Sequence, residues 1–265
     1  MRHNKCYNHR SPEAFCLIIL KMAGKYTLER ASERFKTKID WLESYHSFSF
    51  ADHYDPKRLG FGALLVLNDD TIAPKSGFGA HSHRDMEIIT IPLSGKLTHK
   101  DNIGNHSSID NSMVQIMSAG TGITHVEWNE ETEKVELFQI WITPNEKNLT
   151  PRYKEQVFDE KLYKNNFYTF VNPTGNNKTI KIFQESYLSR GQFDKKQTVG
   201  YTMQGKNTGV YVMVIEGEVK VDETYILAKR DALGVSGVKE ITLEVGEKSD
   251  ILLIEVSLVG REGVN

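Results

Sequence analysis

The chain has 265 residues, which is enough for two domains that each bury a hydrophobic core. Its 33 lysine and arginine residues nearly balance 35 aspartate and glutamate residues, and the formal net charge of -2 argues against nucleic acid as a direct partner. The two cysteines, Cys6 and Cys16, lie near the N-terminus. A disulfide framework, thiolate metal ligands and a cysteine nucleophile are therefore excluded for the rest of the chain.

Residues 1–22 differ in composition from the rest of the chain. A basic, polar start leads into a short apolar run, Ala14–Leu20, which is too short to span a membrane and lacks a clear signal-peptide cleavage site. We expect residues 1–22 to be an N-terminal extension that is disordered or not native, with Met22 as the true start. We also expect a cytoplasmic protein that does not bind membranes.

Short apolar or alternating runs, bounded by Gly, Asn, Asp or Pro, recur along the rest of the chain, and few segments have a helical period. Such a pattern is typical of strands in sandwiches or barrels, so it predicts an all-β protein. The clearest runs are Phe61–Leu67, which we expect to end at Asn68-Asp69-Asp70, and Met86–Leu93, Val135–Thr143 and Val210–Ile215.

The strand pattern is interrupted around residues 142–166, which contain two prolines and many Asn, Lys and Glu residues. We therefore predict a linker at 146–166, with a short helix around Tyr153–Tyr163, between an N-terminal domain (23–145) and a C-terminal domain (167–265).

Two glycines, Gly95 and Gly217, each lie between two strand-like runs, and this echo indicates duplicated barrels. If the two glycines are equivalent, the positions that match His81 and His83 are Met203 and Gly205. We therefore expect the C-terminal domain to bind no metal.

The motifs His81-Ser82-His83 and His125-Val126-Glu127 are the strongest functional signal. Because side chains alternate along a strand, both members of each pair point the same way, and two such pairs can close on one ion. All nine histidines lie at or before residue 125, which packing alone does not predict. The alternative is that they are ordinary half-buried strand histidines.

Three imidazoles and one carboxylate suit a divalent transition metal such as Fe, Mn, Ni, Cu, Zn or Co, and they leave coordination positions open. Glu127 can then be both a ligand and a catalytic base, because a carboxylate can accept a proton from a substrate hydroxyl. The alternative is a purely structural ligand. Glu87 is either another ligand or, as we favour, an outer acceptor for an imidazole N–H.

Phe78 and Met117 are candidates for a substrate pocket, since Phe78 lies just before the first histidine pair and Met117 lies on one face of the alternating segment Met113–Met117. Both are equally suited to an ordinary core. His99 with Asp101, and the residues His46, His53 and His106, are candidates for outer or rim positions around the metal.

Three stretches of the chain resemble the pirin family of the cupin superfamily. They are Gly60–Asp70, Gly77–Glu87 and Met117–Glu127. The resemblance is specific from about Thr27 to Pro144 and weaker beyond. It implies a bicupin of two jelly-roll-like β-barrels, with a metal, Fe(II) by preference, held in the first barrel by His81, His83, His125 and Glu127.

The resemblance also implies a function. Quercetinase-like pirins are associated with the cleavage of flavonols such as quercetin by O2, so the expected substrate is a small aromatic hydroxyketone. Other pirins are associated with regulation through protein partners. The alternative is therefore a non-catalytic metal-binding or redox-sensing protein. The sequence shows no basic cluster that would support a third possibility, a sugar-phosphate isomerase.

Overall fold

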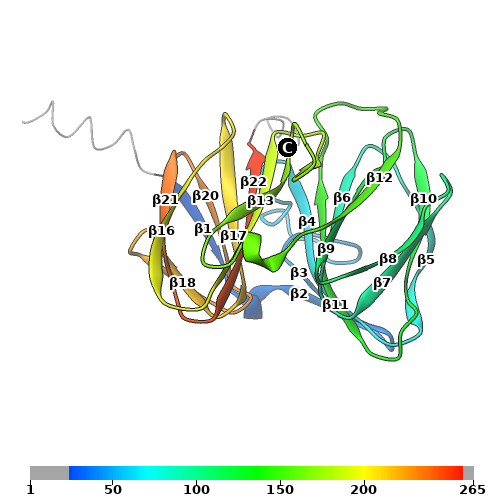
Figure 1. Cartoon of the computed structure of the whole chain (residues 1–265), viewed down its shortest axis with the longest axis horizontal. Coiled ribbons are helices and arrows are strands. Elements are labelled where there is room, and N and C mark those ends of the chain that lie inside the picture. Colours follow the sequence, from blue (N-terminus) through cyan, green and yellow to red (C-terminus); the bar gives the residue numbers. More distant parts are fainter. Residues whose placement is uncertain (1–23, 259–265) are drawn as a thin grey trace, which may run out of the picture.

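A computed structural model describes residues 24–258 of the chain. They form two domains of the same design, each with a seven-stranded and a four-stranded sheet (Figure 1). In this part of the chain, helical structure is limited to the 3-10 helices η1 (Ala31–Glu33) and η2 (Glu160–Leu162). The prediction of an all-β, two-domain fold is therefore confirmed. No helix among residues 24–258 is long and apolar enough to cross a membrane.

The first domain contains the two sheets that hold the histidine motifs. Its seven-stranded sheet runs through β12 (Arg152–Val157), β9 (Met113–Ser118), β6 (Glu87–Ser94), β11 (Val135–Ile142), β4 (Leu64–Ile72), β3 (Leu42–His46) and β2 (Phe35–Lys38). Its four-stranded sheet runs through β5 (Ser76–His83), β10 (Ile123–Asn129), β7 (Lys96–Asp101) and β8 (His106–Asp110).

The second domain repeats this order in its central strands. Its seven-stranded sheet runs through β1 (Lys25–Glu29), β20 (Ala232–Ser236), β17 (Thr208–Glu216), β22 (Ser249–Ser257), β15 (Ser186–Phe193), β13 (Tyr168–Asn172) and β14 (Ile180–Lys181). Its four-stranded sheet runs through β16 (Gln197–Thr202), β21 (Glu240–Val245), β18 (Glu218–Val221) and β19 (Tyr225–Ala228). Its edge strand β14 pairs in parallel with β13, whereas β2 of the first domain pairs antiparallel with β3.

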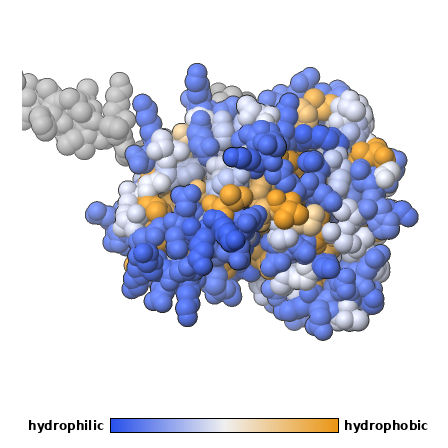
Figure 2. Space-filling view, viewed as in Figure 1, coloured by the Kyte–Doolittle hydropathy of each residue, from blue (hydrophilic) through white to orange (hydrophobic). Residues whose placement is uncertain are grey.

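The two seven-stranded sheets face each other in the middle of the molecule, and the four-stranded sheets lie on the outer sides (Figure 1). Strand alternation explains this layering. In β11, Phe138 and Ile140 join a core shared with Tyr211 and Leu252 of the second domain, whereas Gln139 points into the first domain. The face of the molecule in Figure 2 is largely hydrophilic, with hydrophobic residues grouped near its centre.

In each domain, one edge strand comes from a segment that the sequence analysis had assigned to a different part of the protein. β1 pairs with β20 of the second domain, although residues from 23 onward were expected in the first. β12 pairs with β9 of the first domain and lies within the predicted linker 146–166. The predicted helix at 153–163 is thus wrong except for the three residues of η2, because the polar composition of this segment is that of an edge strand. The predicted extension 1–22 lies outside the described residues.

The glycine echo corresponds to a real equivalence. Gly95 separates β6 from β7 and Gly217 separates β17 from β18, with φ angles of 74° and 79°. A Cβ atom at Gly95 would lie 2.6 Å from the carbonyl oxygen of Lys134, so both the φ angle and the close approach require glycine.

The predicted end of the strand at Asn68-Asp69-Asp70 is wrong. β4 continues to Ile72 and pairs with β3 and β11 through these residues. Asn68 and Asp70 therefore point into the first domain, and Asp69 points to the second, where it forms an ion pair with Arg230 at 2.8 Å.

Candidate metal centre

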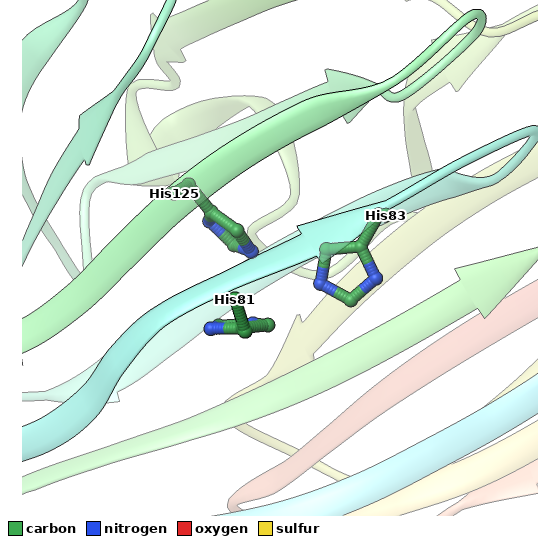
Figure 3. Close-up of side chains that lie close together, drawn as sticks. All are labelled: His81, His83 and His125. Atoms are coloured by element: carbon green, nitrogen blue, oxygen red, sulfur yellow. The ribbon is translucent and has the colours of Figure 1, made fainter.

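Three histidines of the two predicted motifs converge inside the first domain. His81 and His83 lie on β5, and His125 lies opposite His81 on the neighbouring strand β10 (Figure 3). The centres of their rings are 4.4 to 5.0 Å apart. One nitrogen from each ring lies within 4.8 Å of the others. The described geometry thus brings together a set of three imidazoles.

A β-bulge shapes this site. His125 pairs with His81, but Glu127, two residues later, pairs with Phe78, three residues earlier, so β5 carries an extra residue. The bulge explains why Phe78 and His81 point to the same side of the strand despite their odd spacing; both line a cavity beside the histidines, described below. Gly77 allows the strands to approach closely here, since a Cβ atom at this position would clash with the carbonyl oxygen of Glu127.

The hydrogen bonds and protonation states of these histidines suit metal binding. His81 Nδ1 donates to the carbonyl oxygen of Gly79 at 2.8 Å, which leaves its Nε2 lone pair available. Burial and the neighbouring His81 lower the pKa of His83 to about 4, and burial with the surrounding histidines lowers the pKa of His125 to about 2. Both rings are therefore neutral at pH 7, the state in which imidazole binds metals.

Glu127 belongs to a second, overlapping group. Its carboxylate lies within 4.8 Å of nitrogens of His99 and His125, and Gln139 Nε2 donates to Glu127 Oε2 at 2.8 Å. Thr90 Oγ1 lies 3.4 Å from the other oxygen, Oε1. Burial raises the pKa of this carboxyl, while His99 and the hydrogen bond from Gln139 oppose the rise. His125 links the two groups, since it belongs to both.

A chain of hydrogen bonds supports His125 from behind. His99 Nε2 donates to Asp101 Oδ2 at 2.9 Å, so His99 Nδ1 is the acceptor that faces His125 Nδ1 at 3.4 Å. Tyr153 of β12 stacks on the His99 ring, with centroids 4.5 Å apart. The sequence pattern made His99 and Asp101 only candidates for outer positions, because nothing in their spacing shows that both side chains are buried.

One ring nitrogen in this arrangement has no hydrogen-bond partner and could bind a metal. His125 Nε2 is buried and has no hydrogen-bond partner among residues 24–258. An unpaired buried nitrogen is costly, and a metal ion would satisfy it. Together with the neutral imidazoles and the nearby carboxylate, it shows that these residues fit a divalent transition metal.

A cavity of about 330 Å³ lies beside the histidines. Phe78, Trp41 and Trp141 contribute aromatic surface, and His83 contacts Trp141 edge-to-face, with centroids 4.9 Å apart. A volume of this order is usual for pockets that bind small organic molecules, which span roughly 300 to 1,000 Å³.

Two predicted site residues lie elsewhere. Met117 is fully buried in an apolar cluster with Ile88 and Ile123 and is not among the residues that line the cavity. Glu87 accepts hydrogen bonds from Ser118 Oγ and from the backbone N–H of Phe183 in the second domain. The expected role of Glu87 as an acceptor for an imidazole fails because β5 ends at His83.

A break separates the two strands and resets the alternation. β6 begins at Glu87, and Asp85 in the connection has a φ angle of 47°. Among the remaining histidines, His46 lines the cavity, His53 lies 3.3 Å from Thr37 at its edge, and His106 is exposed on β8.

Residues 28–142 match the family model described as Pirin, and residues 169–256 match the model described as Quercetinase C-terminal cupin domain. The chain belongs to the pirin family. This pirin is 36% identical over 230 residues to the quercetin 2,3-dioxygenase of Escherichia coli K12, covering 86% of this chain and 97% of that relative. A putative quercetin 2,3-dioxygenase of Zymomonas mobilis is 38% identical over 215 residues, covering 81% and 91%.

Solved structures agree with this assignment. The bacterial pirin YhhW of Escherichia coli, in complex with nickel(II), matches this pirin with a TM-score of 0.83 at 35% identity, covering 89% of this chain and 100% of that chain. Within residues 24–258, side-chain groups with metal-binding geometry occur in the first domain only. The donor cluster of this pirin and the nickel complex of its relative both fit a divalent metal.

Proposed function

We propose that this pirin is a metal-dependent dioxygenase that cleaves a flavonol such as quercetin with O2, releasing carbon monoxide. The observation that carries the proposal is that the three clustered histidines lie next to an aromatic-lined cavity of about 330 Å³. The names of the relatives in Escherichia coli and Zymomonas mobilis support the same activity.

The proposed ligands are His81, His83, His125 and Glu127, and the proposed metal is Fe(II). Mn, Ni, Cu, Zn and Co have compatible ligand preferences. A bound divalent metal would act as a Lewis acid on the hydroxyketone oxygens and would hold the substrate and O2 close to each other.

The residues themselves position the substrate and take its proton. Glu127 Oε1 is the proposed acceptor of the flavonol hydroxyl proton, because Gln139 donates to Oε2 at 2.8 Å and the contact of Oε1 with Thr90 Oγ1 is long, at 3.4 Å. Burial raises the pKa of this carboxyl, which makes its carboxylate form a stronger base. Trp141 and Phe78 keep water from the face of the bound ring.

Oxygen uptake and loss of quercetin absorbance test the proposal, with protein loaded separately with each candidate metal. Turnover by wild type and its loss in His83→Ala are the expected results, whereas His106→Ala, an exposed histidine outside the cavity, keeps full turnover. A fully metal-loaded wild type without turnover would reject the dioxygenase and favour the regulatory, metal-binding alternative.

A further inference from the structure

Four buried polar side chains form a wall of the cavity that the proposed chemistry does not use. Ser44 and His46 lie on β3, and Asn68 and Asp70 lie on β4; all line the cavity and each is at most 3% exposed. We call these residues the polar wall. Burying so many polar groups is unfavourable unless they bind each other or a ligand, so their presence calls for an explanation.

The polar wall is internally connected. Ser44 Oγ donates to Asp70 Oδ1 and also lies 3.3 Å from His46 Nδ1. His46 Nδ1 in turn lies 2.8 Å from Asn68 Oδ1. These bonds fix the directions of the side chains, while a carboxyl group can form several more hydrogen bonds than the single one from Ser44.

The polar wall and the metal centre lie on different sheets. β3 and β4 belong to the seven-stranded sheet, whereas β5 and β10 with the histidines belong to the four-stranded sheet, and both sets line one cavity. Aromatic side chains complete the lining; they are Trp41, Phe50, Phe78 and Trp141. The cavity therefore offers polar groups from both sheets together with aromatic surface.

A further polar atom of the cavity-lining residues lacks a partner within residues 24–258. Trp141 Nε1 is buried and has no hydrogen-bond partner among the described residues. Since the indole N–H is a donor only, it requires an acceptor such as a carbonyl or hydroxyl oxygen. Trp141 also contacts Phe50 edge-to-face, with centroids 5.4 Å apart, so its ring is held in place.

We propose that Asp70, held by Ser44, is a second substrate-binding subsite that hydrogen-bonds hydroxyl groups of the substrate other than its metal-chelating oxygens. This rests on the proposed function and deepens it, because it makes the substrate a polyhydroxylated aromatic compound. Asp70 is then a specificity-determining residue.

The protonation of Asp70 suits this role. Burial, together with the nearby carboxyls of Asp69 and Glu127, raises its pKa to about 7. Near neutral pH the group can therefore either accept a hydrogen bond from a phenol or donate one to its oxygen.

Anaerobic titration of nickel(II)-loaded protein tests the subsite without turnover. The probes are quercetin and the parent flavonol, which keeps the hydroxyketone of quercetin but has no other hydroxyl group. Quenching of tryptophan fluorescence reports binding, since Trp41 and Trp141 line the cavity. Metal content and thermal unfolding are measured for every variant.

Asp70→Ala should weaken quercetin binding by about tenfold or more and change parent flavonol binding by less than about twofold, as expected for the loss of hydrogen bonds to a buried carboxyl group. Ser44→Ala should show a smaller loss of the same kind and serves if Asp70→Ala does not fold. Asp110→Ala, at the end of β8 outside the cavity, should leave both affinities unchanged.

Equal losses for both probes, or no loss for either, would overturn the subsite. The two proposals fail separately. Selective loss of quercetin binding in a protein that never turns over flavonols supports the subsite and rejects the dioxygenase, whereas turnover without selectivity rejects the subsite alone. No binding of either probe would overturn both.

Discussion

The two domains share the order of their central strands but have different interiors. From the strand pairing, Glu127 faces His99 across β10 and β7, and the equivalent pair across β21 and β18 is Leu243 with Val221. In the second domain the interior is a continuous apolar cluster, whereas in the first it is divided by the histidines and the cavity. The same scaffold thus accommodates either a packed core or a site, depending on a few inward positions.

The pairing also corrects the alignment expected from the glycines. His125 pairs with His81, and the equivalent pair is Ile241 with Tyr201. Tyr201 therefore matches His81, and Met203 matches His83. The alignment through Gly95 and Gly217 had placed both matches two residues later, at Met203 and Gly205. Tyr201 uses its hydroxyl to donate to Glu255 at 2.7 Å, which is a structural role.

The largest expected effect comes from giving the first domain a residue of the second. His125→Ile should lower metal affinity by well over about 100-fold, more than changes around a metal usually cause, because it removes the histidine shared by both donor groups. Metal content after gel filtration measures this. A control change in the second domain, Met203→Ala at the position that matches His83, should leave metal content unaltered, and a loss there would contradict the division of roles.

The second domain should instead be sensitive to cavities. Leu243→Ala should lower the free energy of unfolding by about 2 to 5 kcal/mol, because the side chain is fully buried in the apolar cluster. Urea denaturation measures the change. Metal stoichiometry at low temperature should stay at the wild-type value; a parallel loss of metal would show that the two interiors are coupled.

In metal-free protein, acid should lower the free energy of unfolding through His83 of the first domain. The pKa of His83 is about 4 in the folded protein, below its ordinary value of 6.5, so the unfolded chain binds more protons between these pH values. The stability from this residue is complete above pH 6.5 and is lost as the pH falls towards 4. After allowance for partial exposure, wild type should lose about 1 to 2 kcal/mol more than His83→Gln between pH 7 and pH 4.5.

Urea unfolding of chelator-treated protein at both pH values gives this difference directly. Equal losses in wild type and His83→Gln would show that the ring is not held neutral by burial. A second-domain control, Gln197→Ala, changes no ionisable group and should follow wild type.

The smallest expected effect concerns the support behind the metal centre. His99→Leu should weaken metal binding by about tenfold, since it removes the hydrogen bond that orients His125. His99→Gln should restore part of the affinity. Competition with a chelator measures both, and unchanged affinity in His99→Leu would exclude an orienting role.

Alternation along strands was sufficient to predict that His81, His83 and His125 converge, because each motif lies within one strand. The same rule failed for Glu87, where a left-handed residue, Asp85, separates two strands. It also provided no reason to place Phe78 beside His81, which requires a bulge set by pairing with β10. Local periodicity does not encode such irregularities.

Sequence reasoning named His46 of the polar wall as a rim candidate but missed Asn68 and Asp70, for a different reason. Asn68 and Asp70 have the composition of a turn, and only pairing with β3 and β11 shows that the strand continues through them. The edge strand β12 was hidden in the same way within a polar segment. Both errors arise because tertiary context overrides local preference.

The crossed edge strands have a consequence for synthesis. β12 ends at Val157, so every strand of the first domain has been made before most of the second domain exists. Of the strands among residues 24–258, β1 is made first, but it pairs with β20, and Lys25 lies opposite Ser236. On the ribosome, the nascent chain can therefore complete its metal-binding domain while β1 is still unpaired. Its partner strand, β20, is made more than 200 residues later.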